Sequence, residues 1–447
     1  MQDRVFHILT FGCQMNVNDS GWLARMLAAR GFREGGLEEA SLVVVNTCSV
    51  REKPELKVKS ALGRIRQETA GREVLVCVCG CVAQQLGEKL FGCSPQVRLV
   101  AGTDGIASIP GALEELLDHP ERRLCLTDFT VRYEERPDAL GARVAPSCFV
   151  NIMQGCDNFC TYCIVPYTRG RQKSRAHGAV LGECRELVAR GASEITLLGQ
   201  NVNAYGKDKT GDGTSFASLL RQAATLPGLR RLRYVTPHPK DMTEEDVALF
   251  GELGPLCPRL HLPVQAGSDR VLKRMNRRYT SADFLALVSR LRQACPGIAL
   301  STDLIVGFPG ETEKDFQATL ALVRECGFMA SYSFCYSDRP GARASLFPDK
   351  VPAEEAQDRL LRLQALQEEL GEAWYRSRVG DSCELLMERP SPRQDDGDGP
   401  VSWQGRDPWG APVHVALPGD RDWQGAFVKV RITDARKHSL LGEAAGV

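Results

Sequence analysis

Cysteine is the residue type whose spacing in this sequence could support chemistry. The chain contains 17 cysteines among 447 residues, and Cys156, Cys160 and Cys163 form a C-x3-C-x2-C triplet directly after a strand-like segment. Three thiolates on one loop suit a [4Fe–4S] cluster and leave one iron without a protein ligand. An open iron can chelate S-adenosylmethionine (SAM), and an electron delivered through such a cluster then generates a deoxyadenosyl radical. The triplet therefore predicts a cluster that binds SAM.

Zinc and disulfide bonds account for the cysteines less well. Structural zinc usually takes four ligands from two C-x2-C pairs, and no second pair accompanies the triplet. Disulfides fit poorly, because an odd number of cysteines cannot pair completely and cytosolic thiols are kept reduced. We expect many of the remaining cysteines to be small buried hydrophobic residues. Tyr162, immediately before the third cysteine of the triplet, is placed to lie against the adenine of SAM.

A second trio of cysteines is spread over the first hundred residues. Cys13, Cys48 and Cys81 each follow a strand-like run, and the carboxyl ends of parallel strands meet at one edge of a sheet. The pattern predicts a second [4Fe–4S] cluster with an open iron, and three unrelated buried cysteines are the alternative. Cys77 and Cys79 are rivals for the third position. We favour Cys81 because it repeats the Gly-Cys pair seen at Cys13 and lies farthest along its strand.

Four polar side chains are candidates for holding SAM. They stand at or near the ends of the second, fourth and fifth strands expected after residue 147, and they are Gln200, Asn201, Gln265 and Asp303. Such groups could bind the amino, carboxylate and ribose groups of the cofactor. The alternative for each is a loop or capping residue.

The segments that must position these residues alternate between strand and helix patterns from the start of the chain. Continuous β-branched runs separated by helices indicate a parallel sheet that is buried on both faces. We therefore predict a doubly wound parallel α/β domain over residues 3–121. Its expected strands are 5–9, 42–45 and 74–78, and its expected helices are 20–30, 54–68 and 82–90.

From residue 147 the alternation restarts with a longer repeat. The expected strands are 148–153, 194–198, 231–235, 259–264, 298–306 and 329–335. Six βα units predict a partial (β/α)6, TIM-like barrel whose chemistry lies at the C-terminal ends of its strands. We place this barrel at residues 142–374, and the amphipathic segment 352–376 predicts a helix that packs on it.

The pattern changes again in residues 376–442. Short strand-like pieces at 383–387, 413–416 and 426–432 are separated by clusters of Gly, Pro and Asp. This pattern is typical of a small β-barrel.

Charge and hydropathy narrow the class of protein. The chain has 56 basic and 56 acidic side chains, so its net charge is zero. A nucleic acid would therefore have to bind to a local basic patch, because the protein as a whole does not attract it. The longest apolar runs are far shorter than the ~20 residues of a membrane span, and the N-terminus shows no secretory pattern. We expect a cytoplasmic enzyme with no membrane partner.

Several strings carry a resemblance to a known family. They are TFGCQMN at 10–16, NTCSVREK at 46–53, Gly155-Cys156, LLGQNVN at 197–203 and HLPVQ at 261–265. In these strings and in the order of its parts, the chain resembles the radical-SAM methylthiotransferases, and within them the MiaB branch. The resemblance implies an auxiliary cluster on Cys13, Cys48 and Cys81, a SAM cluster on the triplet, and a C-terminal TRAM domain that binds RNA.

The resemblance also implies an activity and partners. The MiaB branch adds a methylthio group to C2 of N6-dimethylallyladenosine next to the tRNA anticodon (position 37), with two SAM and two [4Fe–4S] clusters. The implied partners are tRNA and an electron donor such as flavodoxin or ferredoxin, and we expect a monomer. Sibling branches act on threonylcarbamoyl-adenosine in tRNA or on a ribosomal protein, but Gln14-Met15-Asn16 favours the MiaB branch. Cys77, Cys79, Ala266 and Arg343 depart from the family pattern.

RNA contact would rest on local charge. Basic residues gather at 165–178, 268–280 and 51–72, and together these runs predict a phosphate track. Trp403, Trp409 and Trp423 could stack on bases, while the acidic run 395–398 would point away from phosphate. A non-catalytic iron–sulfur protein that binds RNA or senses redox state is the remaining alternative, but a sensor gains nothing from an iron that is open to SAM.

Overall fold

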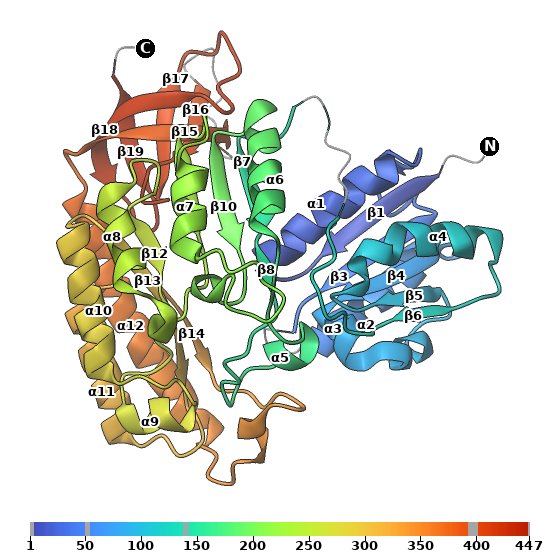
Figure 1. The fold of residues 1–447 in the computed structure, drawn as a ribbon, viewed down its shortest axis with the longest axis horizontal. Coiled ribbons are helices and arrows are strands. Elements are labelled where there is room, and N and C mark those ends of the chain that lie inside the picture. The colour runs from blue at the N-terminus through green and yellow to red at the C-terminus, as the bar shows by residue number, and fades with distance from the viewer. Residues whose placement is uncertain (1–3, 50–53, 137–140, 142, 392–400, 446–447) are drawn as a thin grey trace.

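The computed structural model describes residues 4–49, 54–136, 141, 143–391 and 401–445 (Figure 1). Its first part is a six-stranded parallel sheet in the order β2-β1-β3-β4-β5-β6. The strands are β1 (Val5–Thr10), β2 (Arg33–Glu34), β3 (Leu42–Thr47), β4 (Leu75–Gly80), β5 (Val97–Ala101) and β6 (Leu124–Leu126). The valines of β3 and β4 are fully buried, as expected for central strands covered on both faces.

Helices cover both faces of this sheet. α1 (Gln14–Ala28) and α4 (Ile109–Asp118) share one apolar core with it, while α2 (Pro54–Glu68) and α3 (Cys81–Leu86) share the other. The predicted doubly wound α/β fold is confirmed. Short 3-10 segments follow α3 and precede α4 at η1 (Gly87–Gly92) and η2 (Gly105–Ser108).

The first helix begins earlier than the sequence predicts. α1 starts at Gln14 rather than at residue 20, because polar side chains in its first turns are buried against the sheet. The amide nitrogen of Asn16 donates to the side chain of Asn46 at 2.7 Å and to the carbonyl of Thr47 at 2.9 Å. These hydrogen bonds tie the start of α1 to the end of β3.

The middle of the chain forms six parallel strands in two sheets, β11-β10-β7 and β12-β13-β14. The strands are β7 (Ser147–Asn151), β10 (Glu194–Leu198), β11 (Arg231–Tyr234), β12 (Arg259–His261), β13 (Ala299–Val306) and β14 (Ala330–Cys335). The two sheets meet at an isolated bridge between Leu232 and Leu256. The predicted partial (β/α)6 barrel is confirmed.

Helices cover the outside of this barrel (Figure 1). They are α6 (His177–Ala189), α7 (Phe216–Ala224), α8 (Glu244–Glu252), α10 (Ser281–Ala294) and α11 (Glu313–Cys326). Capping boxes at Thr243, Thr280 and Thr312 define where α8, α10 and α11 begin. The shorter elements are β8 (Met153–Gln154), α5 (Val165–Thr168), β9 (Lys173–Ser174), η3 (Val202–Ala204), η4 (Pro239–Asp241), α9 (Asp269–Arg274) and η5 (Arg343–Leu346).

The predicted helix at 352–376 is confirmed as α12 (Ala353–Ser377), which packs against α11 and β14. Ala356 and Leu363 are buried as expected. Arg359 is also fully buried, because its guanidinium pairs with the buried carboxylate of Glu311 at 3.0 Å. Within the described ranges, no helix has both the length and the apolar character needed to cross a membrane.

The last part is a closed five-stranded barrel in the order β15-β16-β17-β19-β18. Its strands are β15 (Ser382–Pro390), β16 (Val401–Arg406), β17 (Pro412–Leu417), β18 (Phe427–Ala435) and β19 (Leu440–Ala444). The predicted small β-barrel is confirmed, with β16 and β19 added to the three strands expected. Trp403 and Trp423 fill its core, so the prediction that they stack on RNA bases is wrong. The acidic run 395–398 lies outside the described residues.

Candidate functional site

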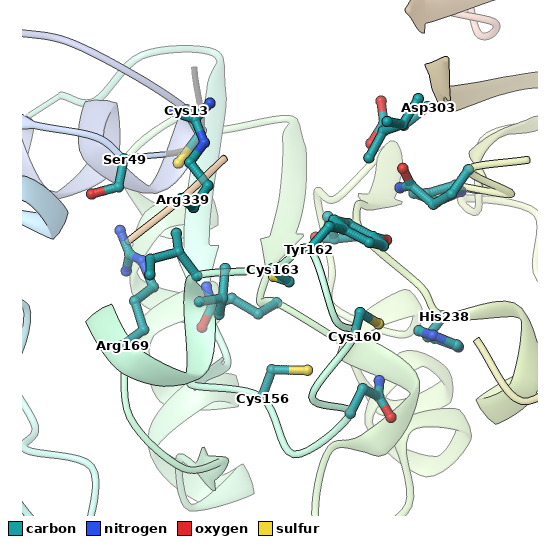
Figure 2. A pocket seen from close by; sticks show the side chains of 18 of the residues that line it. Cys13, Ser49, Cys156, Cys160, Tyr162, Cys163, Arg169, His238, Asp303 and Arg339 are labelled. Carbon is teal, nitrogen blue, oxygen red and sulfur yellow. The ribbon is translucent and has the colours of Figure 1, made fainter. Parts of the chain in front are cut away.

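A cavity of about 370 Å³ lies between the first domain and the barrel. One wall contains Cys13, Met15 and Ser49, which follow strands β1 and β3 (Figure 2). The opposite wall is the loop after β8 together with the C-terminal ends of barrel strands. Four of the six predicted cluster ligands line this space, namely Cys13, Cys156, Cys160 and Cys163. Cys13 of the first domain and all three loop cysteines therefore share one cavity, at the strand ends where α/β folds bind ligands.

A tight turn of the backbone holds Cys156, Cys160 and Cys163, which we call the loop trio. Figure 2 shows the side chains of Cys156, Cys160 and Cys163 around one common space. Gly155 has φ +81°, and a side chain there would collide with the carbonyl of Arg171, so only glycine fits directly before the first cysteine. The N–H of Cys156 donates to the carbonyl of Gly170 at 3.3 Å.

The three loop thiols occupy a low-dielectric environment. Burial raises the pKa of Cys156 to about 11 and that of Cys163 to about 12, so ligation must displace protons from both thiols. A buried arginine offsets the charge that ligation creates. Arg277 places Nη1 3.6 Å from Sγ of Cys160 and 3.4 Å from the hydroxyl of Tyr162, and its Nη2 donates to the carbonyl of Pro263 at 2.7 Å.

Two glycines bring together Cys13, Cys48 and Cys81, which we call the strand-end trio. A side chain on Gly12 (φ +127°) would approach the Cβ of Cys48 to 2.4 Å, and one on Gly80 (φ +90°) would approach the carbonyl of Thr47 equally closely, 2.4 Å. The repeated Gly-Cys pair is thus a packing requirement. Contact with the Cys48 thiol, aided by the charge of Arg169, lowers the pKa of Cys13 to about 5 although burial opposes this shift.

The rival cysteines point into the core. Cys77 and Cys79 are completely buried in the core that the sheet shares with α1 and α4. Contact with Cys77, followed by burial, raises the pKa of Cys79 well above its ordinary value. Cys81 instead begins α3 and is an electrostatic neighbour of Arg169, as are Cys13 and Cys48. This geometry favours Cys81 as the third member of the trio.

Four of the five predicted SAM contacts line the cavity, and they are Tyr162, Gln200, Gln265 and Asp303. Oε1 of Gln200 accepts the N–H of Gly155 at 2.6 Å, and its amide nitrogen contacts the sulfur of Met15 from the first domain. Oδ1 of Asp303 lies 3.3 Å from Nε2 of His261. Asn201 is not among the lining residues, because its amide donates to Asp241 at 2.6 Å instead.

The cavity also contains residues that the sequence interpretation missed. Asn158, Arg169 and His238 each line it and each carry a buried side-chain nitrogen that lacks a hydrogen-bond partner within the described part of the chain. Nδ1 of His238 accepts the N–H of Lys240, which leaves Nε2 as the donor. Burial, followed by the charge of Arg277, lowers the pKa of His238 to about 2, so the ring is neutral.

These unpaired donors test whether the implied cofactors fit. Buried N–H groups without partners are rare in proteins and call for an acceptor. Cluster sulfides and thiolates, and the carboxylate of SAM, are acceptors of that kind. Three thiols with three unsatisfied donors around one space therefore fit an iron–sulfur cluster with SAM. Across the described ranges no group of three His, Cys, Asp or Glu side chains is placed to hold a single metal ion.

The predicted phosphate track is wrong for four of its bases. The buried members are Arg169, Lys173, Arg175 and Arg277. Lys173 pairs with Asp104 of the first domain, and Arg175 pairs with Glu135 and Glu183. Other members of the basic runs are exposed: Arg171, Lys273, Arg278, Lys57, Lys59, Arg64 and Arg66. Residues 51–53 of the first run lie outside the described residues.

Two family models match the chain. The model described as "Radical SAM superfamily" matches residues 150–323, and the one described as "Uncharacterized protein family UPF0004" matches residues 5–102. Membership of the radical SAM superfamily implies a [4Fe–4S] cluster and SAM.

Full-length relatives define the family more narrowly. A protein named tRNA-2-methylthio-N(6)-dimethylallyladenosine synthase from Nitratidesulfovibrio vulgaris (strain DP4) is 60% identical over 100% of this chain and 99% of its own length. The chain belongs to this synthase family. Synthases of the same name from Oleidesulfovibrio alaskensis and Lawsonia intracellularis are 55% and 51% identical, over 100% and 99% of this chain and 99% of each relative.

Solved structures resemble the synthase fold at low sequence identity. The radical SAM methyltransferase TsrM from Kitasatospora setae matches 77% of this chain and 74% of its own, with a TM-score of 0.53 and 16% identity. The cobalamin-dependent SAM radical enzyme OxsB matches 82% of this chain and 56% of its own, with a TM-score of 0.51 and 12% identity. At these identities the likeness concerns the fold alone.

Proposed function

We propose that this chain is a tRNA methylthiotransferase that adds a methylthio group to C2 of N6-dimethylallyladenosine at position 37. The observation that carries the proposal is the single cavity lined by Cys13 from one domain and by the three loop cysteines from the other. A reaction that needs both a radical source and a sulfur donor requires two such centres facing one substrate. The full-length identity to synthases of this name supports the same conclusion.

The chemistry explains why two centres are needed. C2 of adenine is an unactivated aromatic carbon, and acid–base catalysis offers no easy route to a carbon–sulfur bond there. SAM held at an open iron would supply the radical chemistry needed to remove the C2 hydrogen. We assign the SAM cluster to Cys156, Cys160 and Cys163, and the auxiliary [4Fe–4S] cluster to the strand-end trio.

The remaining cavity residues bind and orient SAM or exclude water from it. We assign SAM to Tyr162 on the cysteine loop, Gln265 after β12 and Asp303 in β13. Gln200, which joins the cysteine loop to the first domain, is the fourth contact. Asn201 would affect SAM binding indirectly, through Asp241, because their side chains are hydrogen-bonded. The apolar wall keeps water from a radical and suits the dimethylallyl group. It includes Leu198, Val235, Pro263, Ile305 and Phe334.

The proposal extends to domains and partners. We assign residues 3–121 to the auxiliary-cluster domain, 142–374 to the radical-SAM core and 376–442 to an RNA-binding TRAM domain. The exposed bases on α2 and around Lys273 and Arg278 are candidates for tRNA phosphates. Flavodoxin or ferredoxin would supply electrons to a monomer in the cytoplasm, where cysteine ligands stay reduced.

The test is an anaerobic reaction of the reconstituted full chain with SAM, dithionite and an anticodon stem-loop RNA. One substrate carries dimethylallyladenosine at position 37, and a second carries threonylcarbamoyl-adenosine. Mass spectrometry of nucleosides should show the methylthio product from the first substrate alone, with about two SAM consumed per product. Product from the second substrate alone would assign the chain to a sibling activity. If neither RNA changes and no deoxyadenosine forms, the chain is not a methylthiotransferase.

A further inference from the structure

One buried cation belongs to the barrel but lies among the thiols of the other domain. Arg169 follows α5 in the barrel part of the chain and is only 4% exposed. Its electrostatic neighbours are Cys81, Cys13 and Cys48, together with Asp19. Figure 2 shows its side chain directed toward Cys13 and Ser49.

The acidic neighbours of this cation are the three thiols and Asp19. Oδ1 of Asp19 also forms an ion pair with Arg136 at 2.5 Å. Nη2 of Arg169 is buried and lacks a hydrogen-bond acceptor among the described residues. An arginine cannot lose its proton in a protein, so its charge is permanent, and a buried charge without a partner is costly.

The backbone holds Arg169 between the two cysteine trios. Its own N–H donates to the carbonyl of Val165 at 2.7 Å. The carbonyl of Thr168 accepts the hydroxyl of Thr103 in the first domain at 2.8 Å. On the other side, the carbonyl of Gly170 accepts the N–H of Cys156. The residue is therefore fastened to the first domain and to the SAM-cluster loop at once.

We propose that Arg169 is a positioning residue that completes the auxiliary-cluster site from the neighbouring domain and offsets the negative charge of the bound cluster. The inference rests on the proposed function, since that proposal assigns a cluster to Cys13, Cys48 and Cys81. Three thiolates on a [4Fe–4S] core carry a net charge of about −1, and about −2 after reduction. A fixed positive charge favours the more negative reduced form and raises the reduction potential.

The experiment isolates the auxiliary site. Residues 156, 160 and 163 are changed to alanine in the full chain, so that iron bound after anaerobic reconstitution reports on the other trio. R169Q and R169K are compared in this background. R171Q is the matched control, because Arg171 lies on the same loop but its side chain is 72% exposed and pairs with Asp157 at the surface. Iron content and the potential from a titration followed by electron paramagnetic resonance are measured.

R169Q should shift the reduction equilibrium at least tenfold toward the oxidised form, which is ~59 mV for one electron, or lose the cluster. R169K should retain the cluster with a smaller shift, and R171Q should match the parent. A parent without iron would overturn the proposed auxiliary cluster itself. An R169Q cluster with parental iron and parental potential would overturn only the role of Arg169.

A second background tests whether R169Q changes the charge beside the auxiliary cluster or disturbs the fold in general. R169Q is also made in a chain with Cys13, Cys48 and Cys81 changed to alanine, where iron reports on the loop trio. About four irons per chain are expected there. Loss of this cluster as well would show a general structural defect and overturn the specific role of Arg169.

Discussion

The two proposed cluster sites are built in opposite ways. The loop trio comes from one short segment after β8, and its arginine, Arg277, belongs to the same barrel. The strand-end trio comes from the ends of β1, β3 and β4, and its arginine, Arg169, comes from the other domain. A site on one loop can form wherever that loop folds. A site assembled from three strand ends depends on the sheet and on the contact between domains.

Removing either trio is the strongest way to break this comparison. We expect about eight irons per wild-type chain and about four after alanine replaces either trio. Only the variant without Cys156, Cys160 and Cys163 should lose reductive cleavage of SAM, because the open iron that binds SAM is then missing. Iron analysis and deoxyadenosine measurement check both parts. Equal loss of SAM cleavage in both variants would refute the division of labour.

The contact between the first domain and the barrel should affect iron binding by the strand-end trio only. Lys173 and Asp104 form a buried ion pair between the barrel and the first domain, with each side chain 3% exposed. D104N leaves the lysine charge uncompensated and should cost about 3 kcal/mol, as measured by urea unfolding, with iron lost from the strand-end trio first.

The control for this contact is E114Q, which breaks the exposed pair between Arg30 and Glu114. Exposed pairs contribute under ~1 kcal/mol, so E114Q should leave stability and iron content nearly unchanged. Preferential loss of iron from the loop trio in D104N would contradict this prediction, because the domain contact would then support the loop trio.

Binding of SAM should distinguish residues that line the cavity from those beside it. D303N should weaken SAM binding about tenfold, or about 1.4 kcal/mol, because Asp303 lines the cavity from within the fifth barrel strand, β13. N201A should change SAM affinity less than D303N, because Asn201 bonds to Asp241 rather than facing the cavity. Calorimetry on the reconstituted chain measures both, and a larger effect of N201A would reverse our assignment.

The smallest effect concerns the rival cysteines. Cys79 lies in the apolar core, so C79A should cost about 1 kcal/mol of stability and leave the iron content unchanged. C81A should lose the auxiliary cluster. If the two variants exchanged these outcomes, Cys79 would be the ligand and Cys81 a core residue.

Much of the fold was predictable because apolar periodicity is local. The β-branched runs of β3 and β4 and the alternation of the barrel predicted strands that the structure contains. β5, β6, β16 and β19 were not expected, because short strands are stabilised mainly by their neighbours in the sheet. The burial of Arg359 on α12 was not predicted, because the residue is charged and its burial depends on Glu311 from a distant segment.

The sequence by itself determined the two trios of thiols, the tight glycines beside them and the order of the three folds, because each follows from spacing and composition over short distances. Tertiary structure alone decided that Cys13 shares a cavity with the loop trio, that Cys77 and Cys79 face the core, and that Arg169, Lys173 and Arg175 are buried. The physical reason is that a charged side chain is buried only where distant residues supply its partners, and sequence spacing does not encode those contacts.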